Sequence, residues 1–510
     1  MSQSSSSQPW GYGFNRVKST GTVNYDSFNG DIEFNINASE SERWISPKNS
    51  YLSIKLRIIQ TDETGTAGLL APIVNTGVSK AAATLVSVPY IAPNPAAALF
   101  SAVSCNIGEE NISSNQNIAQ SNTLYRSLYE SKLEQDTVNG TNPIKYMSLA
   151  DTDITANKSA VLSEYFGSAP NTGYPNNLAN LSNRKLFALK NMMGFNKYNE
   201  IEIQTQLLAP LMYSDDLIPP NTPLSLRYTV DPMYYLNLIQ IAGSNVSSLP
   251  VAPATPTNFT IGKLTSANSN AGSLNNISVG IVDMNLWLYQ VHMPNVVGIP
   301  KEIYIKQFTS TLHAITQGTH DEFVFDCKKN RRITHIACAF VQKKGSIKTS
   351  PTDFSSGYYI GANNAGVDTP NAAATTEAKV YSNSPIDQLL NIRIEYAGSV
   401  YPFQPYTLNF DTTGATSSGS TYRSFYDFVN YSDGLRDRNG TLLTSDQWIV
   451  TPIILFKTFQ APDNDDNSCL ISLDFKQSIS GCNIFVCAYY DEVLSLAYDS
   501  YGKYQSFSVY

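Results

Sequence analysis

The stretch DIEFNINASESERWISPKNSYLSIKLRII, residues Asp31–Ile59, determines the fold class that the sequence predicts. Apolar and polar residues alternate in it twice, before and after a polar segment that contains Pro47. The apolar positions are Ile32, Phe34 and Ile36 in the first run and Leu52, Ile54, Leu56 and Ile58 in the second. Side chains of a β-strand point to opposite faces in turn, so each run predicts a strand with one buried face. The polar segment predicts an exterior turn, and the strands predict one wall of a β-sandwich.

The same alternation recurs along the chain and predicts further strands. They cover residues 99–105, 200–207, 224–230, 278–294, 302–308, 322–327, 333–341, 392–396, 453–459, 470–475 and 484–490. In the strand at 278–294, the expected apolar face consists of Val282, Met284, Leu286 and Leu288. Side chains on one face of a strand are two residues apart, so these positions point toward one core.

Two segments have a different period. Leu124 and Leu128, with Tyr125 and Tyr129 beside them, are spaced i, i+4, which predicts a helix within residues 116–135. A short helix is also expected at residues 422–431. Three stretches rich in small and polar residues predict long surface loops. These loops are 60–98, 241–276 and 345–385.

Each half of the chain thus contains about eight strands, long loops and a helix, which is typical of a jelly roll. The predicted fold is all-β, with two tandem jelly-roll β-sandwiches, long loops and a few short helices. The expected segments are an N-terminal arm at 1–20, a first jelly roll at 21–296, a second jelly roll at 297–497 and a C-terminal arm at 498–510. The N-terminal arm contains Trp10, Tyr12 and Phe14, so we expect it to form a strand when it docks.

Composition limits the classes of function. Charged residues make up 15% of the 510 residues, against roughly 25% in soluble domains, and a lightly charged surface suits a protein that other protein covers. The net charge of −8 lacks the basic footprint of a nucleic-acid coat, so contact with nucleic acid is expected to be weak or absent. The N-terminus does not resemble a secretory signal, and no apolar run approaches the roughly 18 residues of a membrane span. Synthesis in the cytosol is therefore expected.

Side chains with catalytic or metal-binding chemistry are few and poorly spaced. The four histidines show no paired spacing, and His335 and Cys338 would point to opposite faces of a strand. The run Asp463–Asn467 offers oxygen ligands for Ca²⁺ but lacks the glycine and glutamate of an EF-hand loop, so a solvated turn is expected. The six cysteines include no C-x-x-C pair, so we expect reduced, mostly buried thiols. No catalytic residue, metal site or cofactor is predicted, and the protein is not expected to be an enzyme.

Six short segments and the predicted helix around Leu124 occur in a fixed order along the chain, and this order can be compared with known families. The segments are ALFSAVSCNIGEENI (98–112), DLIPPNTPLSL (216–226), VDMNLWLYQVHMP (282–294), IEYAGSVYP (394–402), CLISLDF (469–475) and GCNIFVCAYYDEVLSL (481–496). In this order, within a duplicated chain of this length, they resemble the double jelly-roll major capsid proteins of polinton-like viruses, adintoviruses and virophages. The resemblance covers roughly residues 20–497, and the three long loops have no recognisable counterpart in that family.

The resemblance implies a homotrimer whose two jelly rolls per chain form a pseudo-hexagonal building block of an icosahedral shell around a DNA genome. It places the protein in the virion, in contact with neighbouring capsomers and with vertex (penton) and minor capsid proteins. A β-sandwich binding module, such as a lectin or a fibre head, is the alternative, and an enzyme on a jelly-roll scaffold comes third. Fold alone does not choose between them.

One basic cluster stands out in an otherwise acidic chain. It lies in a predicted tight turn between two strands and consists of Lys328, Lys329, Arg331 and Arg332. As a turn, the cluster needs only to be soluble. On the inner wall of a shell, it could contact the phosphates of packaged DNA.

The C-terminal arm has an aromatic side chain at every third position. These residues are Tyr498, Tyr501, Tyr504, Phe507 and Tyr510. A spacing of three would align the rings along one edge of an extended, polyproline-like chain. Exposed rings are an aggregation liability, so we expect the arm to lie in a groove on its own second jelly roll, a neighbouring subunit or the next capsomer. A flexible tail with chance spacing is the alternative.

Overall fold

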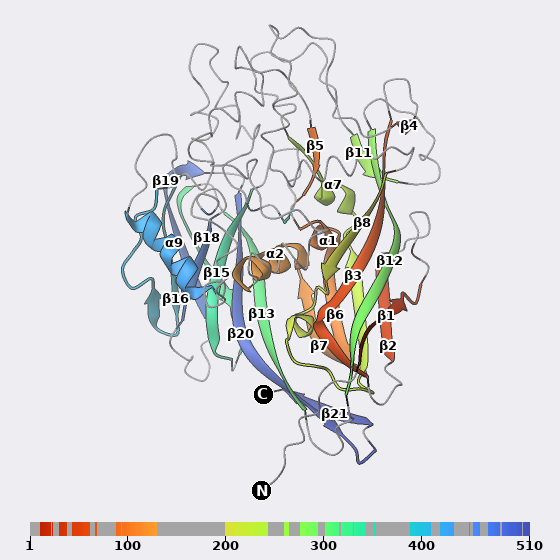
Figure 1. Ribbon diagram of the computed structural model, residues 1–510. Helices are drawn as coiled ribbons and strands as arrows, with labels where there is room; N and C mark the ends of the chain where they lie inside the picture. The colour runs from red at the N-terminus through yellow and green to blue at the C-terminus, as the bar shows by residue number, and fades with distance from the viewer. Residues whose placement is uncertain are drawn as a thin grey trace.

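The computed structural model describes most of the predicted strands and helices. The described residues are 11–21, 30–37, 43–61, 88–92, 94–129, 199–242, 260–264, 276–293, 301–315, 318–329, 331–342, 388–409, 419–432, 452–458, 468–479, 482–501 and 503–509, with 23, 67, 68, 351, 352, 354 and 448. Within them the chain forms two sandwiches, each of two facing sheets whose strands run roughly parallel to the long axis of Figure 1.

The first sandwich is built from strands of the N-terminal half. One sheet, called sheet 1a here, has the order β1 (Gly11–Lys18), β12 (Asn276–His292), β3 (Arg43–Thr61), β8 (Asn199–Gln206). The facing sheet, sheet 1b, has the order β2 (Asp31–Asn37), β9 (Pro223–Val230), β6 (Phe100–Ile107), β7 (Glu110–Gln116). All neighbours in this order pair antiparallel.

The second sandwich repeats this arrangement in the C-terminal half. Sheet 2a has the order β13 (Lys301–Ala314), β20 (Cys482–Tyr498), β15 (Ile333–Gln342), β18 (Ile453–Lys457). Sheet 2b has the order β14 (Gly318–Asp326), β19 (Ser468–Ile479), β16 (Leu389–Tyr396), β17 (Ser399–Tyr401). The sheet orders match strand for strand. In each sandwich, the first, third, sixth and eighth strands in sequence form one sheet, and the others form the second.

This strand order is that of a jelly roll, in which eight strands form two Greek keys. The predicted fold, two jelly rolls in tandem, is therefore confirmed. Smaller elements are added to it. They are β4 (Ala67–Gly68), β5 (Val88–Ile91), β10 (Ile239–Ala242), β11 (Thr260–Lys263), β21 (Tyr504–Val509), α1 (Pro95–Ala98), α2 (Ile118–Tyr129), the 3₁₀ helix η1 (Pro210–Tyr213), α7 (Tyr234–Leu238) and α9 (Gly419–Tyr431). In each jelly roll a helix, α2 or α9, lies between the fifth and sixth of the eight strands.

The stretch Asp31–Ile59 forms strands as predicted, but the two strands belong to different sheets. All seven of its predicted apolar positions are buried between sheets 1a and 1b. The expectation of an exterior turn was wrong for its later part, because β3 begins at Arg43 and buries Trp44 and Ile45. Ile45 also exchanges two backbone hydrogen bonds with Ile218.

In β12 a bulge moves one predicted core residue away from the core. The register with β3 shifts between Ile281 and Asp283, so Val282 is the extra residue. Ile281, Met284, Leu286 and Leu288 are buried, whereas Val282 is only partly so. The strict alternation that predicted Val282 at the core does not hold across such an irregularity.

Two of the predicted long loops contain regular structure where they are described. In residues 60–98, β5 pairs with β10 and α1 is fully buried, and in residues 241–276, β11 pairs in parallel with β12. Most of 345–385 lies outside the described residues, although Thr352 and Phe354 are buried. The predicted domain boundary near residue 296 and the run Asp463–Asn467 also lie outside them.

Both predicted arms contribute strands. Residues 11–18 of the N-terminal arm form β1, which pairs with β12 as β13 pairs with β20 in the second jelly roll. The polyproline-like geometry predicted for the C-terminal arm was wrong. A turn at Asp499–Lys503 reverses the chain, and β21 pairs antiparallel with the end of β20. The backbone of β20 thus provides the hydrogen-bond partners that a polyproline chain would lack.

Candidate assembly surfaces

The helix α2 packs on α1 and β6 of the first jelly roll, to which it belongs in sequence, and also contributes to the core cluster of the second. Leu124 and Leu128, which are fully buried, belong to the cluster between and around sheets 2a and 2b. The Tyr129 ring contacts the Tyr489 ring of β20 edge-to-face, with centroids 5.4 Å apart. The Lys306 ammonium lies 4.5 Å from the centroid of the Tyr129 ring, a cation–π contact. Figure 1 shows α2 between the two jelly rolls.

Tyr125, one helical turn before Tyr129, ties α2 to the first jelly roll. Its ring stacks on that of Tyr213 in η1 with centroids 4.2 Å apart, and also contacts the Tyr129 ring at 4.8 Å. Burial raises the pKa of the Tyr489 hydroxyl well above its usual value. Tyr489 is fully buried, and the surface under α2 is an aromatic cluster to which both jelly rolls contribute.

A second contact joins the jelly rolls near the chain's C-terminal end. The β13–β20 ribbon extends beneath the first jelly roll (Figure 1), and Ile303, Ile305, Leu494 and Leu496 belong to the first core cluster. The hydroxyls of Thr222 and Tyr498 are 2.7 Å apart. Two separate contacts thus fix the orientation of one jelly roll relative to the other.

The outer face of sheet 1a carries a cluster of aromatic side chains. The Phe14 ring lies edge-to-face against Tyr289, at 5.0 Å, and against Tyr51, at 5.5 Å. Tyr12 stacks on Tyr289 at 6.1 Å, and Trp287 stacks on Tyr51. We call Tyr12, Phe14, Tyr51, Trp287 and Tyr289 the aromatic face. Tyr12 and Phe14 are among the most exposed large apolar side chains in the described chain.

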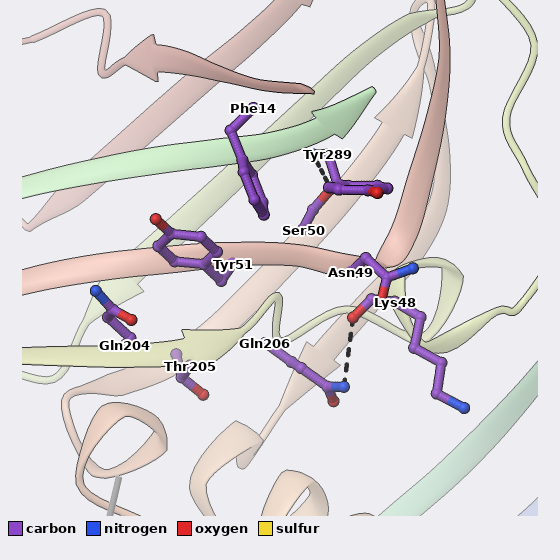
Figure 2. Close-up of a pocket in the computed structure, with 9 residues that line it drawn as sticks. All are labelled: Phe14, Lys48, Asn49, Ser50, Tyr51, Gln204, Thr205, Gln206 and Tyr289. Atoms are coloured by element: carbon purple, nitrogen blue, oxygen red, sulfur yellow. Dashed lines mark hydrogen bonds between the residues drawn. The ribbon is translucent and has the colours of Figure 1, made fainter. Parts of the chain in front are cut away.

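A groove of about 360 Å³ runs beside the aromatic face (Figure 2). Its apolar part consists of Phe14, Tyr51 and Tyr289. Its polar part consists of Lys48, Asn49, Ser50, Gln204, Thr205 and Gln206. The Ser50 hydroxyl accepts a hydrogen bond from the Tyr289 backbone N–H at 2.9 Å, and the Gln206 amide donates to the Lys48 carbonyl at 3.4 Å. Internal hydrogen bonds therefore hold part of the polar rim in place.

Polar contacts also border the aromatic face beside Trp287. The Arg16 guanidinium donates two hydrogen bonds to Asn285 Oδ1, at 2.8 and 2.6 Å, and lies 3.7 Å from the Asp283 carboxylate. It is also 6.0 Å from the centroid of the Trp287 ring. An apolar centre with a polar border is the usual anatomy of a protein interface.

The predicted basic cluster lies in the connection from β14 to β15, which crosses from sheet 2b to sheet 2a. Arg331 donates from Nε to Glu492 Oε1 at 3.1 Å, so this guanidinium is paired. Lys328, Lys329 and Arg332 are exposed. Because Ile333 pairs with Tyr490, the cluster lies toward the end of β20 that leads to β21.

Three of the aromatic residues of the C-terminal arm pack within the chain. Tyr498, Tyr504 and Phe507 contact the first core cluster, and the Tyr498 and Tyr504 rings meet edge-to-face at 6.2 Å. Tyr501, at the tip of the turn, is exposed, and Tyr510 lies outside the described residues. The arm therefore links the second jelly roll to the first within one chain.

Two of the histidines contact aspartate side chains on neighbouring strands. His313 Nε2 is 3.0 Å from Asp321 Oδ2 and stacks on Phe323, while His320 Nδ1 is 2.8 Å from Asp474 Oδ1. In these ranges no three His, Cys, Asp or Glu side chains gather closely enough to hold a metal ion. Nor does any described helix combine the length and apolarity needed to cross a bilayer.

The sequence indicated α2 and the docking of Phe14, but not the aromatic face as a unit. Its signal was present. Tyr51, Trp287 and Tyr289 stand at positions where strand alternation predicts a polar, outward side chain. Exposed aromatic residues gathered at such positions are a general mark of an interaction or ligand-binding surface.

No protein-family model and no curated protein matches this sequence. A search of solved structures finds a chain of the Sputnik virophage particle, with a TM-score of 0.52 and 10% sequence identity over 98% of this chain and 88% of the other. This protein has the fold of that virophage chain. The Faustovirus major capsid protein matches with a TM-score of 0.47 and 10% identity over 96% of this chain and 91% of the other. The mavirus major capsid protein matches with a TM-score of 0.46 and 10% identity over 98% and 90%.

The match to the virophage chain covers both jelly rolls, so the similarity extends to their duplication. The resemblance that the sequence suggested, to double jelly-roll capsid proteins, thus holds at the level of the fold.

Proposed function

We propose that this chain is a viral major capsid protein that assembles into pseudo-hexagonal homotrimers and, through them, into an icosahedral shell around a DNA genome. The observation that carries the proposal is the duplicated jelly roll, because the similarity to a chain of a virophage particle spans 98% of the sequence. The low charge supports it, as does the exposed aromatic face with its polar border. In this role the protein is a structural component of the virion rather than an enzyme, and is synthesised in the host cytosol.

The fixed orientation of the two jelly rolls also supports this function. A shell subunit must present its interfaces at constant angles, since a rotation that does not close produces filaments rather than rings. Here α2 and the β13–β20 ribbon hold the jelly rolls at two separate places. Neighbouring capsomers, penton proteins and minor capsid proteins are the proposed further partners.

The mass and outline of the purified protein test the proposal. We expect a stable species of three times the chain mass, with a six-sided outline in negative-stain electron microscopy. A monomer at micromolar concentration without such an outline would contradict it.

One observation favours the alternative, a sugar-binding module. The groove beside Phe14, Tyr51 and Tyr289 combines aromatic rings with amide and hydroxyl groups. A glycan-array screen of the same preparation separates the two functions. Saturable binding of a sugar by a monomer, lost in Tyr51→Ala, would replace the capsid assignment.

We propose a local, weak DNA contact for Lys328, Lys329 and Arg332 on the inner wall of the shell. Their exposure and shared position at one end of the second jelly roll support it. Replacing all three with Gln should lower the packaged genome per particle while particle yield stays constant. Arg331 is left intact because it pairs with Glu492. Unchanged packaging would show that the cluster serves solubility alone.

For the C-terminal arm we propose that its exposed tip at Tyr501, and Tyr510 beyond it, contact a neighbouring subunit or capsomer. Tyr498, Tyr504 and Phe507 then stabilise the chain itself. Tyr501→Ser should reduce particle yield without changing the melting temperature, whereas deletion of residues 498–510 should lower both. If Tyr501→Ser assembles as the wild type does, the tip has no role between subunits.

A further inference from the structure

The two jelly rolls carry the same aromatic pair at the same place in the fold. Phe14 and Tyr289 are cross-strand partners on β1 and β12, the first and last strands of the first jelly roll. Phe308 and Tyr489 are cross-strand partners on β13 and β20, the first and last strands of the second. Both pairs meet edge-to-face, at 5.0 and 5.9 Å.

The pairs differ in what covers them. Phe308 is 7% exposed, and α2 of the first jelly roll places Tyr129 against its partner Tyr489. Phe14 is 53% exposed. Among the described residues of the same chain, no helix packs on Phe14 and Tyr289 as α2 packs on Tyr489. Within the described residues, the first jelly roll therefore leaves exposed an aromatic pair whose equivalent in the second jelly roll is buried.

The second jelly roll also has the helix that would cover such a surface. Helix α9 occupies the same connection as α2, between the fifth and sixth strands. It packs Phe425, Phe428 and Val429 onto its own core. Its other side exposes Tyr422 and Tyr426, which are spaced i, i+4 like Tyr125 and Tyr129 of α2. Residues at this spacing lie side by side on a helix surface.

The positions of the helices give this correspondence a direction. Figure 1 shows α2 on the side of the first jelly roll that faces the second. It shows α9 on the side of the second jelly roll that faces away from the first, and β1 at the opposite edge of the molecule. If one jelly roll follows another in a ring, α9 of one chain meets β1 and β12 of the next.

We infer that Tyr422 and Tyr426 of one copy of this chain pack on the aromatic face of a second copy, as Tyr125 and Tyr129 pack on the second jelly roll within the chain. The contact is head-to-tail, and a ring of three chains satisfies all such surfaces. The groove beside Phe14 and Tyr289 gives a tyrosine ring room to enter. This inference rests on the proposed homotrimer and specifies which residues form its interface.

The first experiment measures trimer dissociation in the variant Tyr422→Ser/Tyr426→Ser. Serine and tyrosine have similar helix propensities, so α9 should stay folded, as its circular dichroism will show. Buried tyrosines are frequent hot spots of interfaces. We therefore expect the trimer of this variant to dissociate at a protein concentration at least about tenfold higher than that at which the wild-type trimer dissociates. The control is Val324→Ser, because Val324 is exposed to the same extent as Tyr426 (62% and 63%) but lies on sheet 2b.

The second experiment tests the head-to-tail geometry with a bismaleimide cross-linker. Chains with Phe14→Cys and chains with Tyr426→Cys are each prepared alone and then mixed under conditions of exchange. The five cysteines described with their side chains are buried, which keeps background reaction low. We expect cross-linked pairs in the mixture and none in either variant alone.

The outcomes separate this inference from the proposed function. The inference would be overturned if trimers of the double variant persisted to the same dilution as wild-type trimers, or if Phe14→Cys chains cross-linked to each other. Either result would leave the capsid function standing. A wild-type chain that remains monomeric would overturn both.

Discussion

The contact of α2 with the second jelly roll predicts a large effect from a small change, Leu128→Ala. Leu128 is 1% exposed and belongs to the core of a jelly roll that is not its own in sequence. Truncation of a buried leucine costs about 2–5 kcal/mol, depending on how far the cavity collapses. For a folding unit of about 200 residues each kcal/mol shifts the melting temperature by roughly 2–4 °C. We therefore expect Leu128→Ala to melt about 4–20 °C below the wild type.

The control for this prediction is Leu390→Ala, which makes the same chemical change at a partly exposed position of β16. Surface substitutions usually alter stability by no more than about 0.5 kcal/mol, so its melting temperature should move by at most roughly 2 °C. Differential scanning calorimetry measures both variants. A shift for Leu128→Ala no larger than that of Leu390→Ala would refute the role of α2.

Hydrogen exchange identifies where the lost stability resides. If α2 stabilises the second jelly roll, Leu128→Ala should reduce protection of the β20 amides around Tyr489, which α2 covers. Protection of β6, in the first jelly roll, should change less. Loss of protection confined to the first jelly roll would mean that α2 stabilises only the half in which it is encoded.

Three further predictions concern single side chains. The hydrogen bond from Arg227 holds the pKa of Asp31 below its usual value. Asp31→Asn should therefore lower the stability of the protein by less than about 1 kcal/mol at pH 7. Thermal scans at different pH values should show this difference above the unfolded-state pKa of about 3.9, and its loss as the pH falls through the lower folded-state pKa. Burial raises the pKa of Cys105 to about 12, so at pH 8 its alkylation, followed by mass spectrometry, should be at least about a hundredfold slower than in urea. Trp448 donates to the Ile453 carbonyl at 2.9 Å; Trp448→Phe should lower the free energy of unfolding by about 1–3 kcal/mol in urea titration, and an unchanged midpoint would contradict this bond's contribution.

The alternation of apolar residues was sufficient to predict the strands, because most of them have one face in a core. Leu52, Ile54, Leu56 and Ile58 are all fully buried, as their spacing predicts. Alternation does not specify the partner of a strand. The strands β2 and β3 are neighbours in sequence but lie in facing sheets. The passage of the chain from one sheet to the other depends on long-range packing. The bulge at Val282 likewise depends on register with β3, which one strand's sequence does not contain.

The candidate surfaces were less predictable, because they depend on which elements meet. The spacing of Leu124 and Leu128 predicts a helix, but not that its apolar side enters the other jelly roll's core. The threefold spacing of aromatic residues in the C-terminal arm was interpreted from the arm alone. A turn at Asp499–Lys503 lets the arm use the free edge of β20 instead, and hydrogen bonding to that edge determines its conformation.

Both helices carry a tyrosine pair at i, i+4 spacing, but α2 also places Leu124 and Leu128 in the core cluster of the second jelly roll. This chemical difference fits the stage at which each helix would be buried. The surface of α2 is covered as the chain folds, so Leu124 and Leu128 are never exposed to water in the folded protein. The outer side of α9 must stay soluble until a second chain arrives. Tyr422 and Tyr426 suit this requirement, because a tyrosine offers a large ring to bury while its hydroxyl stays hydrated. Leucines there would form a persistent apolar patch that favours non-specific aggregation over the single contact that closes a ring.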